Sequence, residues 1–237
     1  MRRAGRVVAV ALARLEEATA PGVTTAELDA LAESVITAEG AQSAFQGLYG
    51  YPANICASIN DEVVHGIPGP RRLRPGDIVS FDLGAVVEGC YADGAITVGV
   101  GEIPAAARQL LQVTREALAR GIAAARPGRR VFDISAAIQR YAEAAGYTVV
   151  RDLVGHGIGR EMHEAPQVPN FVPSGRSAVL RPGLTLAIEP MVNEGASEVV
   201  RGDDGWTYRT RDGRLSAHFE HTVAVLADGP EILTRAG

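Results

Sequence analysis

The chain repeats one order of short motifs in its two halves, and this repeat constrains the fold more than any other feature of the sequence. His-Gly-Ile occurs at residues 65–67 and again at 156–158. A Pro-Gly pair stands at the same distance before Asp82 as a second pair does before Glu189. Each half is expected to contain two helices, then His-Gly-Ile, then two strands that each carry an acidic residue. Such self-similarity indicates two units related by a pseudo-two-fold axis.

Four acidic residues occupy matching places in the two halves, and the axis would bring them together. They are Asp82, Asp93, Glu189 and Glu220. Four ionised carboxylates cannot share a buried site without cations, and two divalent ions would balance their charge. Carboxylate-rich sites that include an imidazole suit Mn, Fe, Co or Zn. Two bridged metal ions are an arrangement for hydrolysis.

The stretch 78–95 is predicted to form a hairpin that holds the first pair of acids. Its strand-forming residues flank a turn at 87–89, where Glu88-Gly89 is plausible turn chemistry. The turn is expected to place Asp82 nearly opposite Asp93, on the same face. The alternative is a solvated polar face with two unrelated aspartates.

Composition excludes several classes of protein. All 23 basic residues of the 237-residue chain are arginine, which excludes a Schiff-base lysine and a P-loop lysine. The net charge of −5 gives no indication of nucleic-acid recognition or of an anionic membrane surface. Cys56 and Cys90 lack metal-type spacing, so we expect a reduced, cytoplasmic protein. Residues 3–18 fit an amphipathic helix better than a signal peptide, and no apolar run is long enough to span a membrane.

Other local signals predict further elements. Thr24 and Glu27 form a capping box that begins the second helix, Pro104 opens the third, and Gly146 ends the fourth. We expect strands at 149–153 and 217–225 and a strand that ends at Glu189.

The five histidines all lie in the blocks just described. His156 follows a predicted strand and precedes Gly157 and Gly159, where the backbone could approach a ligand closely. We therefore expect His156 to be a neutral metal ligand, and we expect His218 and His221 to be structural.

The blocks that carry these acids and histidines resemble those of the type I methionine aminopeptidases, which have the pita-bread aminopeptidase/creatinase fold. Similar blocks are Asn60–Pro68, His156–Glu164, Glu189-Pro190 and Ser216–Thr222, together with Asp82 and Asp93 at the family's separation. The resemblance implies an α+β fold, with a pseudo-two-fold antiparallel sheet covered by two pairs of helices. It implies one catalytic domain over residues 1–237, with halves of about 1–100 and 104–225.

The resemblance also implies the role of each site residue. Asp93 and Glu220 would bridge two divalent metal ions, Asp82 would bind one of them, and His156 and Glu189 would bind the other. Glu189 would also carry a proton, and His65 and His163 would contact the scissile peptide. The resemblance also implies a monovalent cation as an additional cofactor. The methionine pocket would be apolar and shallow and would involve Phe45, Tyr51, Cys56, Met162 and Trp206.

Three residues depart from the family pattern. Phe45 stands where some relatives have cysteine, Met162 replaces an aromatic residue, and His218 replaces a glutamine. The expected activity is removal of the N-terminal methionine from nascent polypeptides with a small second residue, by a monomer in transient contact with the ribosome. The alternatives are a proline-specific aminopeptidase or prolidase of the same fold, or a non-catalytic binding protein.

Overall fold

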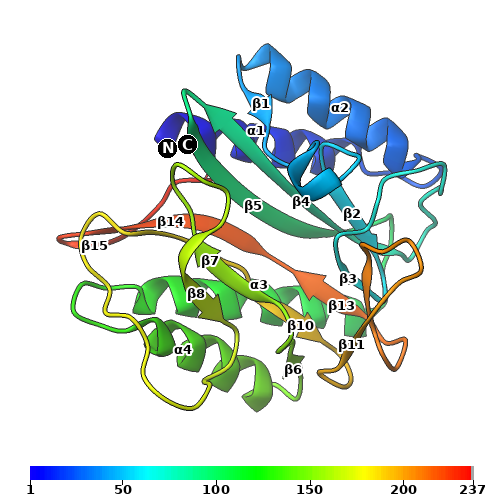
Figure 1. The fold of residues 1–237 in the computed structure, drawn as a ribbon. Helices are drawn as coiled ribbons and strands as arrows, with labels where there is room; N and C mark the ends of the chain where they lie inside the picture. The colour runs from blue at the N-terminus through cyan, green and yellow to red at the C-terminus, as the bar shows by residue number, and fades with distance from the viewer. Residues whose placement is uncertain (236–237) are drawn as a thin grey trace.

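Two pairs of helices lie against the two halves of a large sheet (Figure 1). The computed structural model describes residues 1–235. The helices are α1 (Arg2–Ala18), α2 (Thr25–Ala38), α3 (Ala105–Ala124) and α4 (Val131–Ala144). Over these described residues, none of the helices has the length and apolar character needed to cross a membrane.

Local sequence signals set the helix ends as expected. The Thr24 hydroxyl accepts from the backbone N–H of Glu27, and the Glu27 carboxylate accepts from the backbone N–H of Thr24. This capping box satisfies donors that the first turn of α2 leaves unpaired. Gly40 and Gly146 follow α2 and α4 with φ of 69° and 88°, which glycine adopts without strain.

Each helix pair has its own apolar core. Leu12, Leu15, Leu28 and Ile36 of α1 and α2 are buried with side chains such as Phe81 of the sheet. A second cluster joins α3 and α4 to the other half of the sheet; its members include Leu110, Ile134, Ile138, Leu186 and Val223. The duplicated cores are what the sequence repeat predicts.

The main sheet follows the same symmetry. Its path runs β1–β4–β5–β14–β9–β7–β8, with β2 paired to β4 and β15 paired to β14, and every pairing is antiparallel. The two halves meet where β5 pairs with β14, through Ala95↔Glu220 and His221↔Gly94. The strands are β1 (Gln42–Ser43), β2 (Cys56–Ile59), β4 (Ile78–Val87), β5 (Cys90–Gly99), β7 (Val154–Gly157), β8 (Glu164–Pro169), β9 (Thr185–Ile188), β14 (Glu220–Leu226) and β15 (Gly229–Ile232).

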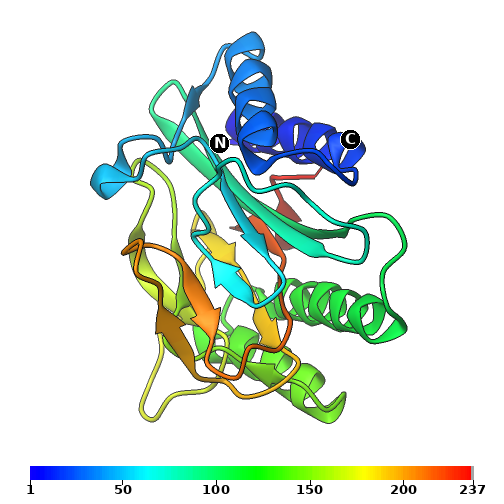
Figure 2. The same cartoon turned by 90° about the vertical axis from the view of Figure 1, so that its right-hand side faces the viewer.

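Two small sheets complete the structure. One has the order β13–β10–β6 and the other β11–β12–β3. In Figure 2 the orange β11–β12 hairpin lies on the side of the main sheet away from α1 and α3. The strands are β3 (Glu62–Val64), β6 (Thr148–Val149), β10 (Met191–Asn193), β11 (Val199–Arg201), β12 (Tyr208–Thr210) and β13 (Ser216–His218).

Three predicted strands have different bounds from those expected. The strand at 149–153 is wrong, because β6 ends at Val149 and His156 itself lies within β7. The strand at 217–225 is divided at Phe219, since β13 pairs with β10 while β14 joins the main sheet. The strand expected to end at Glu189 ends at Ile188, one residue earlier, so Glu189 follows β9 directly.

The predicted hairpin forms, but its register differs from the expectation. Its loop has two residues, Glu88 and Gly89, with φ of 52° and 70°, as in a type I′ turn. The pairs are therefore Asp82↔Ala95 and Gly84↔Asp93, so the two aspartates are diagonal and not opposite. Because side chains alternate with a period of two, both still lie on one face of the sheet.

Candidate metal centre and active site

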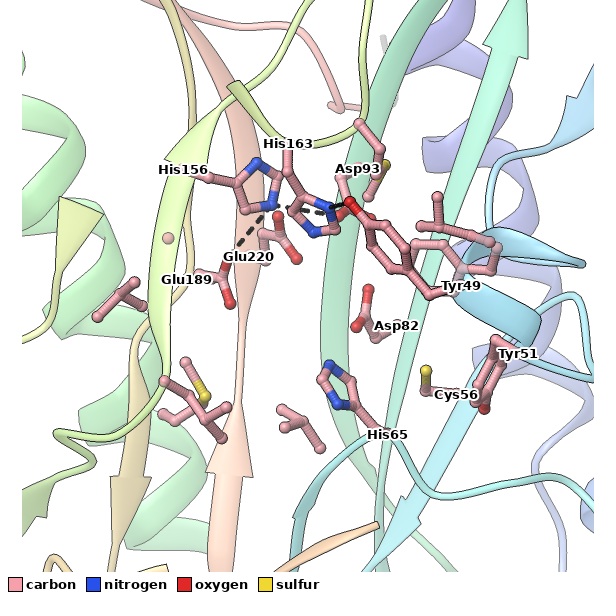
Figure 3. Close-up of a pocket in the computed structure, with 18 of the residues that line it drawn as sticks. Tyr49, Tyr51, Cys56, His65, Asp82, Asp93, His156, His163, Glu189 and Glu220 are labelled. Atoms are coloured by element: carbon pink, nitrogen blue, oxygen red, sulfur yellow. Dashed lines mark hydrogen bonds and ion pairs between the residues drawn. The ribbon is translucent and has the colours of Figure 1, made fainter. Parts of the chain in front are cut away.

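A cavity of about 630 Å³ contains every residue that the sequence predicted for the site. Its walls combine the acids and histidines with apolar side chains. The twelve predicted residues that line it are Phe45, Tyr51, Cys56, His65, Asp82, Asp93, His156, Met162, His163, Glu189, Trp206 and Glu220. Figure 3 shows the charged and imidazole groups turned toward one another across the cavity.

The acids and His156 form a compact group of donor atoms. One atom from each of Asp93, His156 and Glu220 lies within 4.8 Å of the others. His156 Nε2 lies 3.6 Å from Glu189 Oε1 and 3.9 Å from Asp93 Oδ2. β4, β5, β7 and β14 carry four of the five predicted ligands, and Glu189 follows β9.

The Thr222 hydroxyl and the Gly94 backbone hold Asp93 in place. The Asp93 N–H donates to Thr222 Oγ1, and the Thr222 hydroxyl donates to the Asp93 carbonyl oxygen, both at 2.8 Å. The Gly94 N–H donates to Asp93 Oδ1 at 2.9 Å. Gly84 lies opposite Asp93, and a Cβ there would meet Ala44 Cβ at 2.8 Å. The junction between the two halves of the sheet therefore fixes this carboxylate.

The acids are buried together, and among the residues that the structure describes their nearest basic groups are histidines and not arginines. Burial, and then the neighbouring carboxylates, raise the pKa of Asp82, Glu189 and Glu220 well above the usual range. Burial raises the pKa of Asp93 to about 7, although hydrogen bonds from Gly94 and Asp82 act in the opposite direction. Without a cation, the surroundings of these four acids therefore disfavour their ionisation.

This donor set fits divalent metal ions. Asp82 Oδ1 and Glu220 Oε1 are buried and have no hydrogen-bond partner. Buried polar atoms in native proteins are almost always satisfied, so two such oxygens facing one cavity indicate cations as their partners. Oxygen donors combined with one imidazole are ligands that Mn, Fe, Co and Zn accept.

His156 is held in the form that a metal ligand needs. Its Nδ1 lies 2.9 Å from the Gly157 carbonyl oxygen, which can only accept a hydrogen bond. The proton therefore lies on Nδ1, and the Nε2 lone pair faces Glu189 and Asp93. Burial lowers the pKa of His156 to about 4, so the ring is neutral at neutral pH.

The glycines beside His156 have a different role from the one expected. A Cβ at Gly157 would overlap the Ala165 carbonyl oxygen and lie 2.7 Å from its carbon, and a Cβ at Gly155 would overlap the Ala187 carbonyl oxygen. The close approach at Gly157 is thus made by the neighbouring strand β8 and not by a ligand. These glycines let β7 lie tightly between β8 and β9.

Substitution Gly157→Ala is expected to lower the free energy of unfolding by about 1–3 kcal/mol, because β7 and β8 must separate to admit the methyl group. Urea unfolding of the metal-free protein measures the change. Gly69→Ala is the matched control, since a Cβ there meets nothing within 4 Å and the φ is not in the left-handed region; its effect should stay within about 0.5 kcal/mol. Equal stability of the two variants would contradict the tight β7–β8 approach.

His65 and His163 lie on opposite sides of the carboxylate group, below and above Asp82 in Figure 3. His65 has φ of 61° and packs edge to face against Tyr208, with ring centroids 5.9 Å apart. Burial lowers the pKa of His65 to about 4 and also lowers the pKa of His163. Both rings are therefore neutral and can each donate one N–H hydrogen bond into the cavity.

The apolar wall of the cavity is one cluster of side chains. Phe45, Tyr51, Cys56 and Met162 are buried together, and Trp206 packs against them. The Tyr51 ring meets Trp206 edge to face at 5.1 Å, while its hydroxyl is shared between the Ile55 and Gly66 carbonyl oxygens. Burial raises the pKa of the Cys56 thiol, which keeps it neutral. This wall suits an apolar side chain.

His218 does not line the cavity but lies behind Glu189. Its Nε2 is 3.9 Å from Glu189 Oε2, and neither ring nitrogen has a hydrogen-bond partner. Burial, and then His65, lower the pKa of His218 to about 3. His221 lies outside the group and pairs with Thr234 Oγ1 at 2.9 Å, which fits the structural role expected of it.

Several cavity residues were not predicted from the sequence. Tyr49 stands at the mouth beside His163, and Leu153, Gln167 and Met191 line other parts of the wall. The only local signal for Tyr49 was its place between Gly47 and Gly50, which marks an irregular loop.

Comparisons with known proteins agree with this site. The model of metallopeptidase family M24 matches residues 1–227. A methionine aminopeptidase of Clostridium perfringens is 53% identical over 234 residues, which cover 99% of this chain and 94% of the relative. The crystal structure of methionine aminopeptidase from Thermotoga maritima has a TM-score of 0.98 at 46% identity and covers 100% of this chain, which spans 95% of that one.

A prolidase from Pyrococcus furiosus has the same fold, with a TM-score of 0.80 at 23% identity, but this chain covers only 63% of its length. The similarity to the methionine aminopeptidases is thus higher, and it extends over nearly the whole length of both proteins. The pita-bread fold predicted from the sequence is confirmed. The chain belongs to metallopeptidase family M24 and, within that family, to the methionine aminopeptidases.

Proposed function

We propose that this chain removes the N-terminal methionine from polypeptides by hydrolysis of the first peptide bond. The observation that carries the proposal is the cavity itself, in which a buried group of acids and a neutral histidine adjoins an apolar wall. The wall would hold the methionine side chain, and the donor group would face the peptide bond beside it.

Two divalent ions are the proposed cofactors. Asp93 and Glu220 would be shared between them, Asp82 would complete one set of ligands, and His156 and Glu189 the other. Four buried carboxylates with a raised pKa, two of them with an unpartnered oxygen, lie beside a neutral imidazole and support this assignment. When bound, such ions lower the pKa of a water molecule and polarise a carbonyl group.

The residues of the chain would supply the rest of the chemistry. A Glu189 carboxylate oxygen would accept the proton of the attacking water and pass it to the leaving amine, as a general base and then a general acid. His65 and His163 would donate N–H hydrogen bonds to the substrate on either side, where negative charge develops on the carbonyl oxygen. The side of the cavity that Phe45 and Trp206 line would exclude water from the methionine side chain.

The proposal is tested by peptide release from Met-Ala-Ser, Pro-Ala-Ser and N-acetyl-Met-Ala-Ser. Metal-stripped protein is assayed alone and after addition of Mn²⁺ or Co²⁺. We expect metal-dependent release of methionine from Met-Ala-Ser alone, because the acetylated peptide has no free amino terminus for the metal site. Release of proline would indicate the proline-specific alternative.

Cleavage of no peptide by protein that still binds two metal ions would contradict the proposal and favour a non-catalytic binding protein. A parallel series with larger second residues tests the preference for a small one. We expect slower cleavage as the second residue grows.

A further inference from the structure

Tyr49 has an exposed side chain in an unusual backbone conformation. The residue is 76% exposed, the highest value among the large hydrophobic residues exposed in the described part of the chain. Its φ is 52°, and Gly47 and Gly50 beside it have φ of 83° and 88°. Hydrogen bonds from the Gly47 N–H to the Tyr51 carbonyl and from the Tyr51 N–H to the Leu48 carbonyl close the loop. Apolar burial does not explain why an aromatic residue is held here.

The contact that Tyr49 does make is with His163. Its hydroxyl oxygen lies 3.4 Å from His163 Nδ1, and the two rings are stacked, with centroids 5.9 Å apart and planes at 20°. The other side of His163 meets the His156 ring at 4.4 Å. His163 is thus held between Tyr49 and His156 at the mouth of the cavity (Figure 3).

The hydroxyl contact selects a tautomer of His163. A neutral imidazole has one N–H and one acceptor nitrogen, and the partner of one nitrogen decides the state of the other. A phenol is a better donor than acceptor, because its oxygen lone pair is delocalised into the ring. The Tyr49 O–H therefore donates to Nδ1, which leaves the proton of His163 on Nε2.

We infer that Tyr49 is a positioning residue that holds His163 as the Nε2–H tautomer, with the ring oriented to donate toward the scissile carbonyl. The inference rests on the proposed function for the identity of that acceptor. The hydrogen bond and the tautomer do not depend on it and can be measured without substrate or metal.

The first test is the imidazole ¹⁵N NMR spectrum of metal-free Tyr49→Phe, with the His163 signals assigned by comparison with His163→Gln. Wild-type protein is expected to show His163 in one tautomer, with Nδ1 unprotonated. Tyr49→Phe keeps the ring but loses the hydroxyl, and is expected to show a mixture of tautomers. In Tyr49→Phe the phenylalanine ring could move and hold His163 in the same orientation. Tyr49→Leu also removes the stacked ring, so it tests the tautomer without that compensation.

The second test is steady-state cleavage of Met-Ala-Ser by the metal-loaded variants. We expect kcat of Tyr49→Phe to fall about tenfold, by analogy with the loss of a hydrogen-bond partner of a metal-binding histidine, with KM within about twofold. Tyr208→Phe is the matched control. Its ring packs on His65, but no hydrogen bond joins its hydroxyl to that histidine, so the tautomers of His65 and His163 and the value of kcat should not change.

An unchanged His163 tautomer in both Tyr49 variants would overturn the inference. So would a rise in KM with kcat and the tautomer unchanged, since Tyr49 would then be a substrate contact only. If the tautomer shifts but wild-type protein cleaves no peptide, the Tyr49–His163 coupling stands and the proposed function fails.

Discussion

Asp93→Asn is expected to reduce release of methionine from Met-Ala-Ser by at least about a thousandfold. Asp93 has the central place in the donor group, since it lies near His156 and its strand joins the two halves of the sheet. A neutral amide cannot bridge two cations. Loss of a group that acts together with others removes most of the activity that the whole set provides.

The same substitution is expected to stabilise the metal-free protein. Folding raises the pKa of Asp93 to about 7, so above the ordinary pKa of an aspartate its ionisation favours the unfolded state. Removing that charge should raise the free energy of unfolding near neutral pH by roughly 2–4 kcal/mol, since one unit of pKa corresponds to about 1.4 kcal/mol. Urea unfolding of both metal-free proteins measures the difference.

The gain in stability on metal binding provides the control for Asp93→Asn. A ligand at about 100 times its Kd stabilises a folded protein by about 2.7 kcal/mol, so wild-type protein should gain stability with Mn²⁺ or Co²⁺ and Asp93→Asn should gain much less. Asp228→Asn removes the same charge in the β14–β15 turn and should behave as wild type. Near-normal activity of Asp93→Asn would refute its assignment as a bridging ligand.

His163→Ala is expected to slow hydrolysis of Met-Ala-Ser by about 10–10³-fold and to leave the metal content unchanged. His163 packs on His156 and lines the cavity, but it lies outside the group of ligand atoms. Removal of one donor to a developing oxyanion has costs in this range. The measurements are kcat and KM together with the metal content of the dialysed protein.

His156→Ala is the comparison for that variant. It removes the imidazole whose Nε2 faces Glu189 and Asp93, so both metal binding and activity should be lost. Loss of metal from His163→Ala as well would show that His163 is a ligand and that the roles of the two histidines were assigned wrongly.

Much of the site could be predicted from the sequence because its residues follow local signals that recur in both halves. The Pro-Gly pairs, the capping box at Thr24 and the repeated His-Gly-Ile mark where helices and strands begin, and these depend on neighbouring residues along the chain. The repeat then places Asp82 with Glu189, and Asp93 with Glu220. All four line one cavity.

Local signals did not determine which atoms would meet. The two-residue turn at Glu88-Gly89 shifts Asp82 from Asp93 by one diagonal step, and Gly84 takes the opposite position. A predicted single strand divides at Phe219 because β10 pairs with one part and β9 with the other. Both outcomes depend on strand partners distant in the sequence.

The class of the protein, the duplicated fold and the acids and histidines that line the cavity all follow from the sequence alone. The register of the aspartates, the tautomer of His156 and the contact between Tyr49 and His163 depend on the folded structure. The physical reason is that strand periodicity fixes which face a side chain occupies, whereas a hydrogen bond requires two groups to approach within about 3 Å. That approach is set by the packing of loops and strands from both halves of the chain.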